Sequence, residues 1–122
     1  MTPDLLWQRY ARIWSADPVT RARELEACLA DGCSYCDVNV SIKGREALSD
    51  YMAGFQHNVK GGKFQILSVT HHHDRMLAEW RLLGPSDAVL QTGRSFATVA
   101  ADDGRLQSIT GFFDAEQKTR SA

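Results

Sequence analysis

The stretch Met76-Leu77-Ala78-Glu79-Trp80-Arg81-Leu82 alternates between two kinds of residue along its length. Its even-numbered positions are apolar, whereas two of its three odd-numbered positions carry a charge. Successive side chains of a β-strand point to opposite faces of a sheet, so this alternation predicts an antiparallel strand with one buried face. We therefore expect a sheet that has its core on one side.

Strand-like sequence continues on both sides of this stretch. Strands are predicted at residues 64–72, 76–83, 89–100 and 106–113. The segments between them hold turn-forming residues, namely His73-Asp74-Arg75, Gly84-Pro85-Ser86-Asp87 and Asp102-Asp103-Gly104. No helix is expected between these strands, which disfavours a parallel, doubly wound topology.

The N-terminal half shows helical spacing instead. Residues 4–14 place four large side chains on one helical face, namely Leu6, Tyr10, Ile13 and Trp14. Asp17-Pro18 has the pattern of an N-cap followed by proline at the first helical position. The helix that begins there is expected to end at Asp31-Gly32, before a short strand at residues 34–38.

A third helix is predicted between Gly44 and Gly61-Gly62. Three helices followed by a run of strands predict an α+β fold, with the helices packed on one bent antiparallel or mixed sheet. No repeat or linker interrupts the chain, so we expect a single domain over residues 1–122 with a folded core at about residues 4–114.

Composition restricts the partners of the protein. The 122 residues include 14 Lys and Arg against 15 Asp and Glu, for a formal net charge of −1. This balance gives no electrostatic reason to expect a nucleic acid or an anionic membrane surface as partner. No apolar run approaches the roughly 20 residues of a membrane-spanning helix, and the N-terminus lacks the features of a signal peptide. We expect a cytoplasmic protein without nucleic-acid or membrane partners.

The three cysteines are Cys28, Cys33 and Cys36. The last two have the CxxC spacing of redox and zinc sites, but they lead into a strand-like segment instead of opening a helix. An odd number of cysteines also argues against a disulfide framework. We favour packed free thiols over a redox or zinc site.

Three consecutive histidines, His71-His72-His73, permit a second metal hypothesis. On a strand, His71 and His73 would share a face and could chelate a metal ion. A third ligand at a definite spacing is not evident, so we expect surface or pocket-rim histidines and no metal. His72, which has the opposite orientation, is a candidate for the rim of a pocket.

Several short motifs, in this order, resemble the nuclear transport factor 2-like superfamily, and within it the SnoaL-like proteins related to polyketide cyclases and ketosteroid isomerase. The motifs are Tyr35-Cys36-Asp37, Gly44-Arg45-Glu46-Ala47-Leu48, Thr92-Gly93-Arg94-Ser95-Phe96, Asp103-Gly104-Arg105-Leu106 and Gly111-Phe112-Phe113-Asp114. The resemblance implies a cone-shaped half barrel with an apolar pocket for a small molecule. It also implies a homodimer formed through the sheet.

The same resemblance assigns two catalytic candidates. In ketosteroid isomerase-like proteins, an Asp before the third helix is the general base, and a Tyr of the first helix donates a hydrogen bond to the developing oxyanion. Asp37 and Tyr10 occupy these places. The residues alone leave alternatives open: Asp37 fits a side chain that caps its own turn, and Tyr10 fits an ordinary amphipathic stripe.

Large apolar side chains, together with small or polar neighbours, are expected to surround the bound molecule. The residues predicted to bind the substrate are Trp14, Tyr35, Phe55, His72, Trp80, Phe96, Ile109, Gly111 and Phe113.

Two departures from relatives restrict the reaction. Phe96 falls where the isomerase has its second oxyanion donor, and a phenyl ring cannot donate a hydrogen bond. Tyr35-Cys36-Asp37 is similar to the Tyr-x-Asn of limonene epoxide hydrolase. Gly111, however, falls at that enzyme's water-activating Asp, and Trp80-Arg81-Leu82 lacks its acid. Steroid isomerisation at full rate and epoxide opening are therefore disfavoured.

Two classes of function remain. The first is a cofactor-independent isomerase, cyclase or dehydratase that acts on a small apolar molecule. The second is a non-catalytic ligand-binding domain, or a dimeric interaction domain, of the same shape.

Overall fold

The computed structural model describes residues 1–115. Its helices are α1 (Pro3–Ile13), α2 (Pro18–Cys28) and α3 (Arg45–Asn58). Its strands are β1 (Leu29–Asp37), β2 (Val40–Lys43), β3 (Lys63–His72), β4 (Arg75–Leu83), β5 (Val89–Val99) and β6 (Leu106–Phe113).

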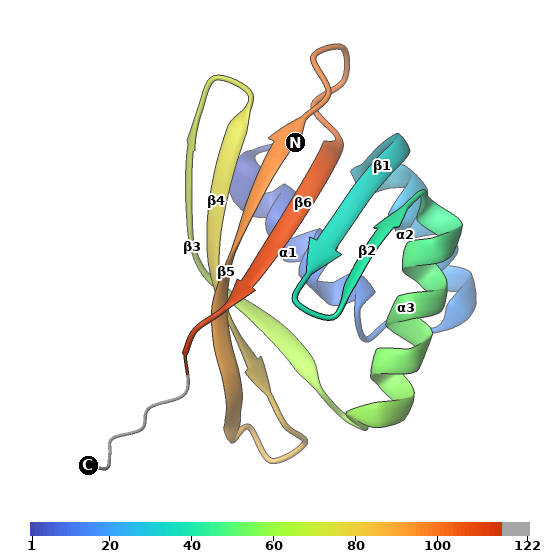
Figure 1. Ribbon diagram of the computed structural model, residues 1–122, viewed down its shortest axis with the longest axis vertical. Helices are drawn as coiled ribbons and strands as arrows, with labels where there is room; N and C mark the ends of the chain where they lie inside the picture. Colours follow the sequence, from blue (N-terminus) through green and yellow to red (C-terminus); the bar gives the residue numbers. More distant parts are fainter. Residues whose placement is uncertain (116–122) are drawn as a thin grey trace.

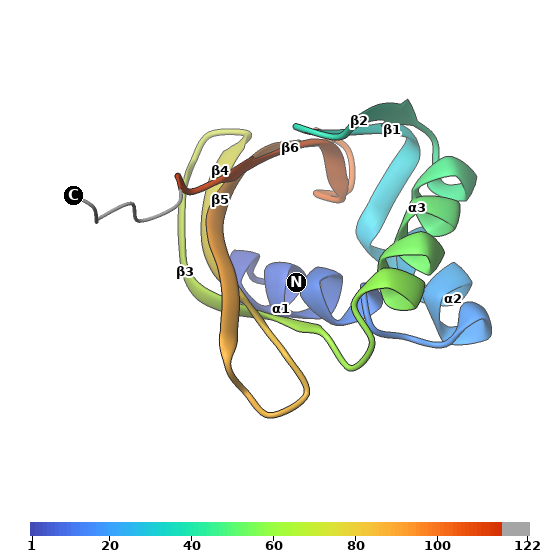
Figure 2. The ribbon, with the colours of Figure 1, turned by 60° about the horizontal axis from the view of Figure 1, so that its bottom comes forward.

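The strands form one mixed sheet in the order β2-β1-β6-β5-β4-β3 (Figure 1). Neighbouring strands run antiparallel except β1 and β6, which are parallel. The sheet is bent and open, and Figure 2 shows α1 on its concave side and α3 beside β1 and β2. Helix α2 packs against α1 and α3. The predicted α+β fold, with three helices on one bent sheet, is confirmed.

The alternating stretch forms β4, as predicted. Ala78, Trp80 and Leu82 are buried, Met76 packs against the core, and Glu79 is exposed. The buried side of β4 faces the concave interior, so the period of 2 in the sequence identifies the side of the sheet on which the core and the cavity lie.

The end of the second helix was predicted wrongly. The helix ends at Cys28, before Asp31-Gly32, and Leu29 already has extended backbone angles (φ −117°, ψ 138°). Leu29 pairs with Leu106 of β6, so the chain joins the sheet at this residue instead of continuing the helix. The first strand is consequently longer than the predicted residues 34–38.

Strand β2 was not predicted. It pairs antiparallel with β1 through a tight connection at Val38 and Asn39. Its sequence, Val-Ser-Ile-Lys, alternates over only four residues, which is too short for a period to be distinguished from chance.

The N-cap predicted at Asp17 is confirmed, and α1 has an N-cap at Thr2 that was not predicted. The Leu5 backbone N–H donates to Thr2 Oγ1 at 3.2 Å, and the Thr20 backbone N–H donates to Asp17 Oδ1 at 2.9 Å. Both helices have proline in their first turn, where its missing N–H costs no hydrogen bond. Local sequence chemistry therefore determines where α1 and α2 begin.

The cysteines are free thiols, as expected. Cys28 and Cys33 are buried in the core, and burial raises the pKa of both thiols above the ordinary value of 9.0. A raised pKa keeps a thiol protonated and unreactive. The two buried thiols therefore act as core side chains.

The three consecutive histidines are all exposed, and His73 has a positive φ of 52° in the turn between β3 and β4. Within residues 1–115, no group of three or more His, Cys, Asp or Glu side chains is arranged to hold a metal ion. No helix in this part of the chain is long and apolar enough to cross a membrane.

A bidentate ion pair joins α1 to α2, with Arg9 Nε 2.9 Å from Glu24 Oε1 and Nη2 2.7 Å from Oε2. The hydrogen bond from Arg9 lowers the pKa of Glu24 below its ordinary value of 4.5. We expect Glu24→Gln to lower the free energy of unfolding at pH 7 by about 0.5–1 kcal/mol.

A lowered pKa in the folded state means that this stabilisation is complete above pH 4.5 and is lost as the pH falls below it. Urea denaturation of both proteins at pH 7 and pH 3 measures the difference. Glu26→Gln, an exposed change on the same helix, is the control, and an equal effect of the two variants would contradict the assignment.

Candidate functional site

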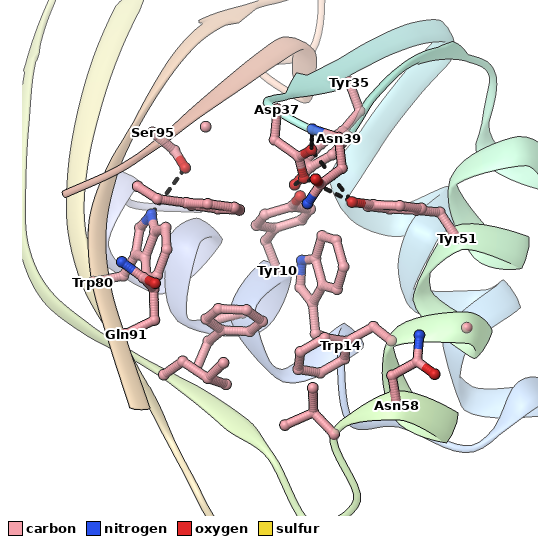
Figure 3. A pocket seen from close by; sticks show the side chains of 18 of the residues that line it. Tyr10, Trp14, Tyr35, Asp37, Asn39, Tyr51, Asn58, Trp80, Gln91 and Ser95 are labelled. Carbon is pink, nitrogen blue, oxygen red and sulfur yellow. Dashed lines mark hydrogen bonds between the residues drawn. The ribbon is translucent and has the colours of Figure 1, made fainter. Parts of the chain in front are cut away.

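A cavity of about 480 Å³ lies between α1, α3 and the concave face of the sheet (Figure 3). This volume is within the range of small-molecule sites, roughly 300–1,000 Å³. The residues that line it are Trp7, Tyr10, Ala11, Trp14, Tyr35, Asp37, Asn39, Asp50, Tyr51, Gly54, Phe55, Asn58, Val59, Phe64, Ile66, Trp80, Leu82, Gln91, Ser95, Gly111 and Phe113.

Aromatic rings make up most of the cavity wall. The Trp14 ring centroid lies 5.5 Å from those of Phe55 and Phe64 and 6.0 Å from that of Tyr51. Several neighbouring ring planes are nearly perpendicular, with angles of 86° between Trp14 and Phe55 and 89° between Phe64 and Trp80, whereas Phe55 and Phe64 are stacked at 26°. Edge-to-face contacts stabilise ring pairs in fixed orientations, so the wall is pre-formed.

Asp37, at the end of β1, lies in the cavity and is only 9% exposed (Figure 3). The Tyr35 hydroxyl donates to its Oδ2 at 2.7 Å, and the Tyr51 hydroxyl donates to the same atom at 3.0 Å. The backbone N–H of Asn39 donates to Oδ1 at 2.8 Å. Asp37 therefore caps its own turn and also lines the cavity.

The two phenols beside Asp37 remain protonated donors. Burial raises the pKa of Tyr35 far above its ordinary value of 10.0, and the hydrogen bond to Asp37 and the negative charge of Asp37 raise it further. Burial, followed by the hydrogen bond to Asp37, also raises the pKa of Tyr51. Neither phenol ionises near neutral pH, so both continue to orient the carboxylate.

Tyr10, on α1, presents a different hydroxyl. It is 5% exposed, and its hydroxyl has no hydrogen-bond partner among the described residues. Burial raises the pKa of Tyr10 well above 10.0, so the hydroxyl keeps its proton. Trp7 and Trp14 pack edge-to-face against the Tyr10 ring, with ring-centroid distances of 5.5 Å and 6.5 Å, and so fix its orientation. Because a buried hydroxyl without a partner costs free energy, Tyr10 is suited to donate to a molecule in the cavity.

The sheet side of the cavity is also fixed by a hydrogen bond. Trp80 Nε1 donates to Ser95 Oγ at 3.0 Å, and both residues are buried. The amides of Asn58 and Gln91 lie away from the Asp37 cluster (Figure 3). The cavity therefore has polar groups around Asp37, aromatic rings in its middle, and the amides of Asn58 and Gln91 away from the Asp37 cluster.

Eight of the eleven predicted site residues line this cavity: Tyr10, Trp14, Tyr35, Asp37, Phe55, Trp80, Gly111 and Phe113.

The other three predicted site residues do not line the cavity, and their placement is corrected here. His72 is exposed at the end of β3, and Phe96 is 40% exposed on the outer face of the sheet. Ile109 shares the inward face of β6 with Gly111, but it is packed in the core at 1% exposure. Alternation along a strand gives the face of a residue and not its depth.

The prediction missed several lining residues. Tyr51, whose hydroxyl bonds to Asp37, lies four residues before Phe55 in α3. That spacing places both rings on one side of a helix, so the pattern contained the signal for Tyr51. Phe64 and Ser95 depend on how strands pair, and no local pattern identifies them.

The structure predicts unequal roles for the two phenols. Tyr35→Phe removes a short, buried hydrogen bond to a carboxylate, and we expect it to lower the free energy of unfolding by about 2 kcal/mol. Tyr51 is half-buried and its bonds to Asp37 are longer, 3.0 Å and 3.3 Å, so Tyr51→Phe is expected to cost about half as much. Urea denaturation of both variants tests the difference, and a larger effect of Tyr51→Phe would contradict it.

The arrangement suits proton transfer next to an oxygen atom. A carboxylate has about four lone-pair positions. Three donors form hydrogen bonds to the Asp37 carboxylate. One lone-pair position is therefore left to accept a proton from a bound molecule. The Tyr10 hydroxyl can donate to an oxygen of the same molecule.

A sequence model of a family described as SnoaL-like domain matches residues 7–109. No curated protein shows significant sequence similarity to the chain.

Solved structures show the same fold at low sequence identity. A candidate isomerase of the SnoaL-like family from Agrobacterium tumefaciens superposes with a TM-score of 0.84 at 19% identity, covering 91% of this chain and 96% of its own. A candidate SnoaL-like polyketide cyclase from Jannaschia sp. gives 0.71 at 16% identity, with coverages of 93% and 90%. A protein with a ketosteroid isomerase-like fold from Catenulispora acidiphila, solved in complex with trimethylamine, gives 0.75 at 16% identity, with coverages of 93% and 88%.

Proposed function

Because this chain belongs to the SnoaL-like domain family, we propose that it is a cofactor-independent enzyme that moves a proton on a small, mostly apolar molecule. The observation that carries the proposal is the buried Asp37 carboxylate in an aromatic cavity, beside the unpartnered Tyr10 hydroxyl. Isomerisation, cyclisation and dehydration all require such a proton transfer.

In this proposal, Asp37 is the base. It takes a proton from a carbon next to a carbonyl group of the substrate, and the electron pair moves onto the carbonyl oxygen. Tyr10 donates a hydrogen bond to that oxygen as its negative charge develops, which stabilises the transition state more than the ground state. Tyr35 and Tyr51 orient the carboxylate without touching the substrate's reacting atoms.

A non-catalytic binding protein is the second candidate, and one observation favours it. Asp37 already accepts three hydrogen bonds, one of them from its own turn, so a structural role also accounts for this carboxylate. Trimethylamine, named for one structural relative, is a small molecule that such a cavity has room for, but the likeness to that relative concerns the fold alone.

Tyr10→Phe tests whether the hydroxyl serves a bound molecule. Small carbonyl compounds are first screened for a rise in the melting temperature of the wild-type protein, because ligands that bind the folded state stabilise it. We expect Tyr10→Phe to bind the hits about tenfold more weakly while its own free energy of unfolding is unchanged or raised. A variant that loses folding stability and keeps its ligand affinity would contradict the assignment.

We also propose that two copies associate through the outer face of the sheet. Leu77 and Phe96 are paired across β4 and β5 and are 43% and 40% exposed, and Phe112 on β6 is 64% exposed. Apolar side chains gathered on one face are typical of an interface between proteins.

We expect Phe96→Glu to shift the protein from dimer to monomer, because a dimer would bury the new charge. Sedimentation velocity at several concentrations measures the shift. Val19→Glu is the matched control, since Val19 is 77% exposed on α2, away from the sheet. A wild-type protein that sediments as a monomer throughout would contradict the interface.

A further inference from the structure

The carboxylate of Asp37 has no cationic partner in the described part of the chain. All of its hydrogen-bond partners there are neutral: two phenols and one peptide N–H. The ion pairs among residues 1–115 join other residues. Buried carboxylates are usually paired with a cation, so a molecule that brings a positive charge into this cavity would be stabilised there.

The charges around the cavity have one sign. A second carboxylate, the solvent-exposed Asp50, also lines it, and no Lys, Arg or His does so among the described residues. An anionic ligand would meet two carboxylates without a compensating cation, whereas a cation would be attracted by both.

The aromatic walls of the cavity would attract a cation independently of the carboxylates. Organic cations bind over the faces of aromatic rings, where the π-electrons are negative. Trp14 meets Tyr10 at 88°, Tyr51 at 80° and Phe55 at 86°, whereas Phe55 and Phe64 are stacked at 26°, so rings in several orientations line the cavity. A cavity that is lined by aromatic rings and also holds a carboxylate has the chemistry that recognises substituted ammonium groups.

We infer that the substrate of this cavity is a small organic cation, a tertiary or quaternary ammonium compound that also carries an oxygen atom. The ammonium group lies among the aromatic rings near Asp37, and the oxygen accepts the hydrogen bond from Tyr10. The inference rests on the proposed function, since it specifies the molecule on which the same site acts.

Three probes of similar shape test the charge. Choline carries the positive charge, 3,3-dimethylbutan-1-ol replaces its nitrogen by carbon, and 3,3-dimethylbutanoate is negative. Isothermal titration calorimetry at pH 7 gives their dissociation constants. We expect choline to bind at least about tenfold more tightly than the neutral alcohol, and the anion to bind most weakly.

Variants separate charge recognition from general binding. Asp37→Asn is expected to reduce the preference for choline over the alcohol to less than about threefold, without weakening the alcohol. Asp31→Asn removes an exposed carboxylate of the same strand that does not line the cavity, and it should keep the wild-type preference. Equal affinities of the wild-type protein for choline and the alcohol would overturn the inference and leave the small-molecule proposal standing. If none of the three probes binds, the inference is also overturned. The proposed enzyme would still be supported if the wild-type protein turns over an uncharged compound from the screen and Tyr10→Phe and Asp37→Asn do not.

Discussion

An Asp37→Asn variant is expected to lose proton-transfer activity by about 10²–10⁴-fold, the usual contribution of a general base. An amide cannot accept the proton, although it has nearly the same shape as the carboxylate. The Tyr35 and Tyr51 hydroxyls can still donate to the amide oxygen, and the amide NH2 then lies beside the Asn39 N–H, so only the hydrogen bond within the turn is lost. The fold should therefore survive the substitution while the chemistry fails.

Exchange of carbon-bound hydrogen for solvent deuterium measures this activity without knowledge of the final product. A carbonyl compound that binds the protein is incubated in D₂O, and NMR follows the loss of the proton next to the carbonyl. Asp31→Asn, at an exposed position of β1 that does not line the cavity, serves as the control and should exchange at the wild-type rate. Equal rates for Asp37→Asn and wild type would remove Asp37 from the mechanism.

Gly93→Ala is expected to have the largest effect on stability. Gly93 lies on β5 opposite Trp80, and an added Cβ would lie 2.5 Å from the Phe112 carbonyl oxygen and would overlap the Trp80 ring. The indole cannot easily move away, because it is buried and bonded to Ser95. We expect the free energy of unfolding to fall by about 3 kcal/mol and the melting temperature by roughly 10 °C.

The matched control is Gly54→Ala on α3. An added Cβ there meets no atom within 4 Å, and alanine is the better helix former. We expect this variant to be more stable than wild type by about 0.5–1 kcal/mol. Urea denaturation of the two variants provides the comparison, and a Gly93→Ala protein as stable as wild type would contradict the packing described for this wall.

Local periodicity predicted those parts of the fold that depend on neighbouring residues. The alternation of β4 gave its buried side correctly, and the Asp17 cap gave the start of α2. The end of α2 depends on the pairing of Leu29 with Leu106, which is distant in the sequence. Such pairing leaves no local pattern, and this explains why the helix was predicted to be too long.

The candidate site was likewise predicted correctly in part and wrongly in part. Asp37 and Tyr10 were placed in one cavity through the resemblance to a family, and the structure brings them to the same cavity. Phe96 was misplaced because a large apolar side chain was expected to face inward. The inward side of β5 instead carries Ser95 and Ala97, and Phe96, which alternates with them along the strand, is exposed on the outer face.

The structure of the protein with a bound hit from the ligand screen tests the central claim most directly. The account predicts a molecule inside the aromatic cavity, with its oxygen within hydrogen-bond distance of the Tyr10 hydroxyl and a carbon in contact with the free side of the Asp37 carboxylate. A hit that binds on the outer face of the sheet, or that lies in the cavity without contacting either group, would contradict it.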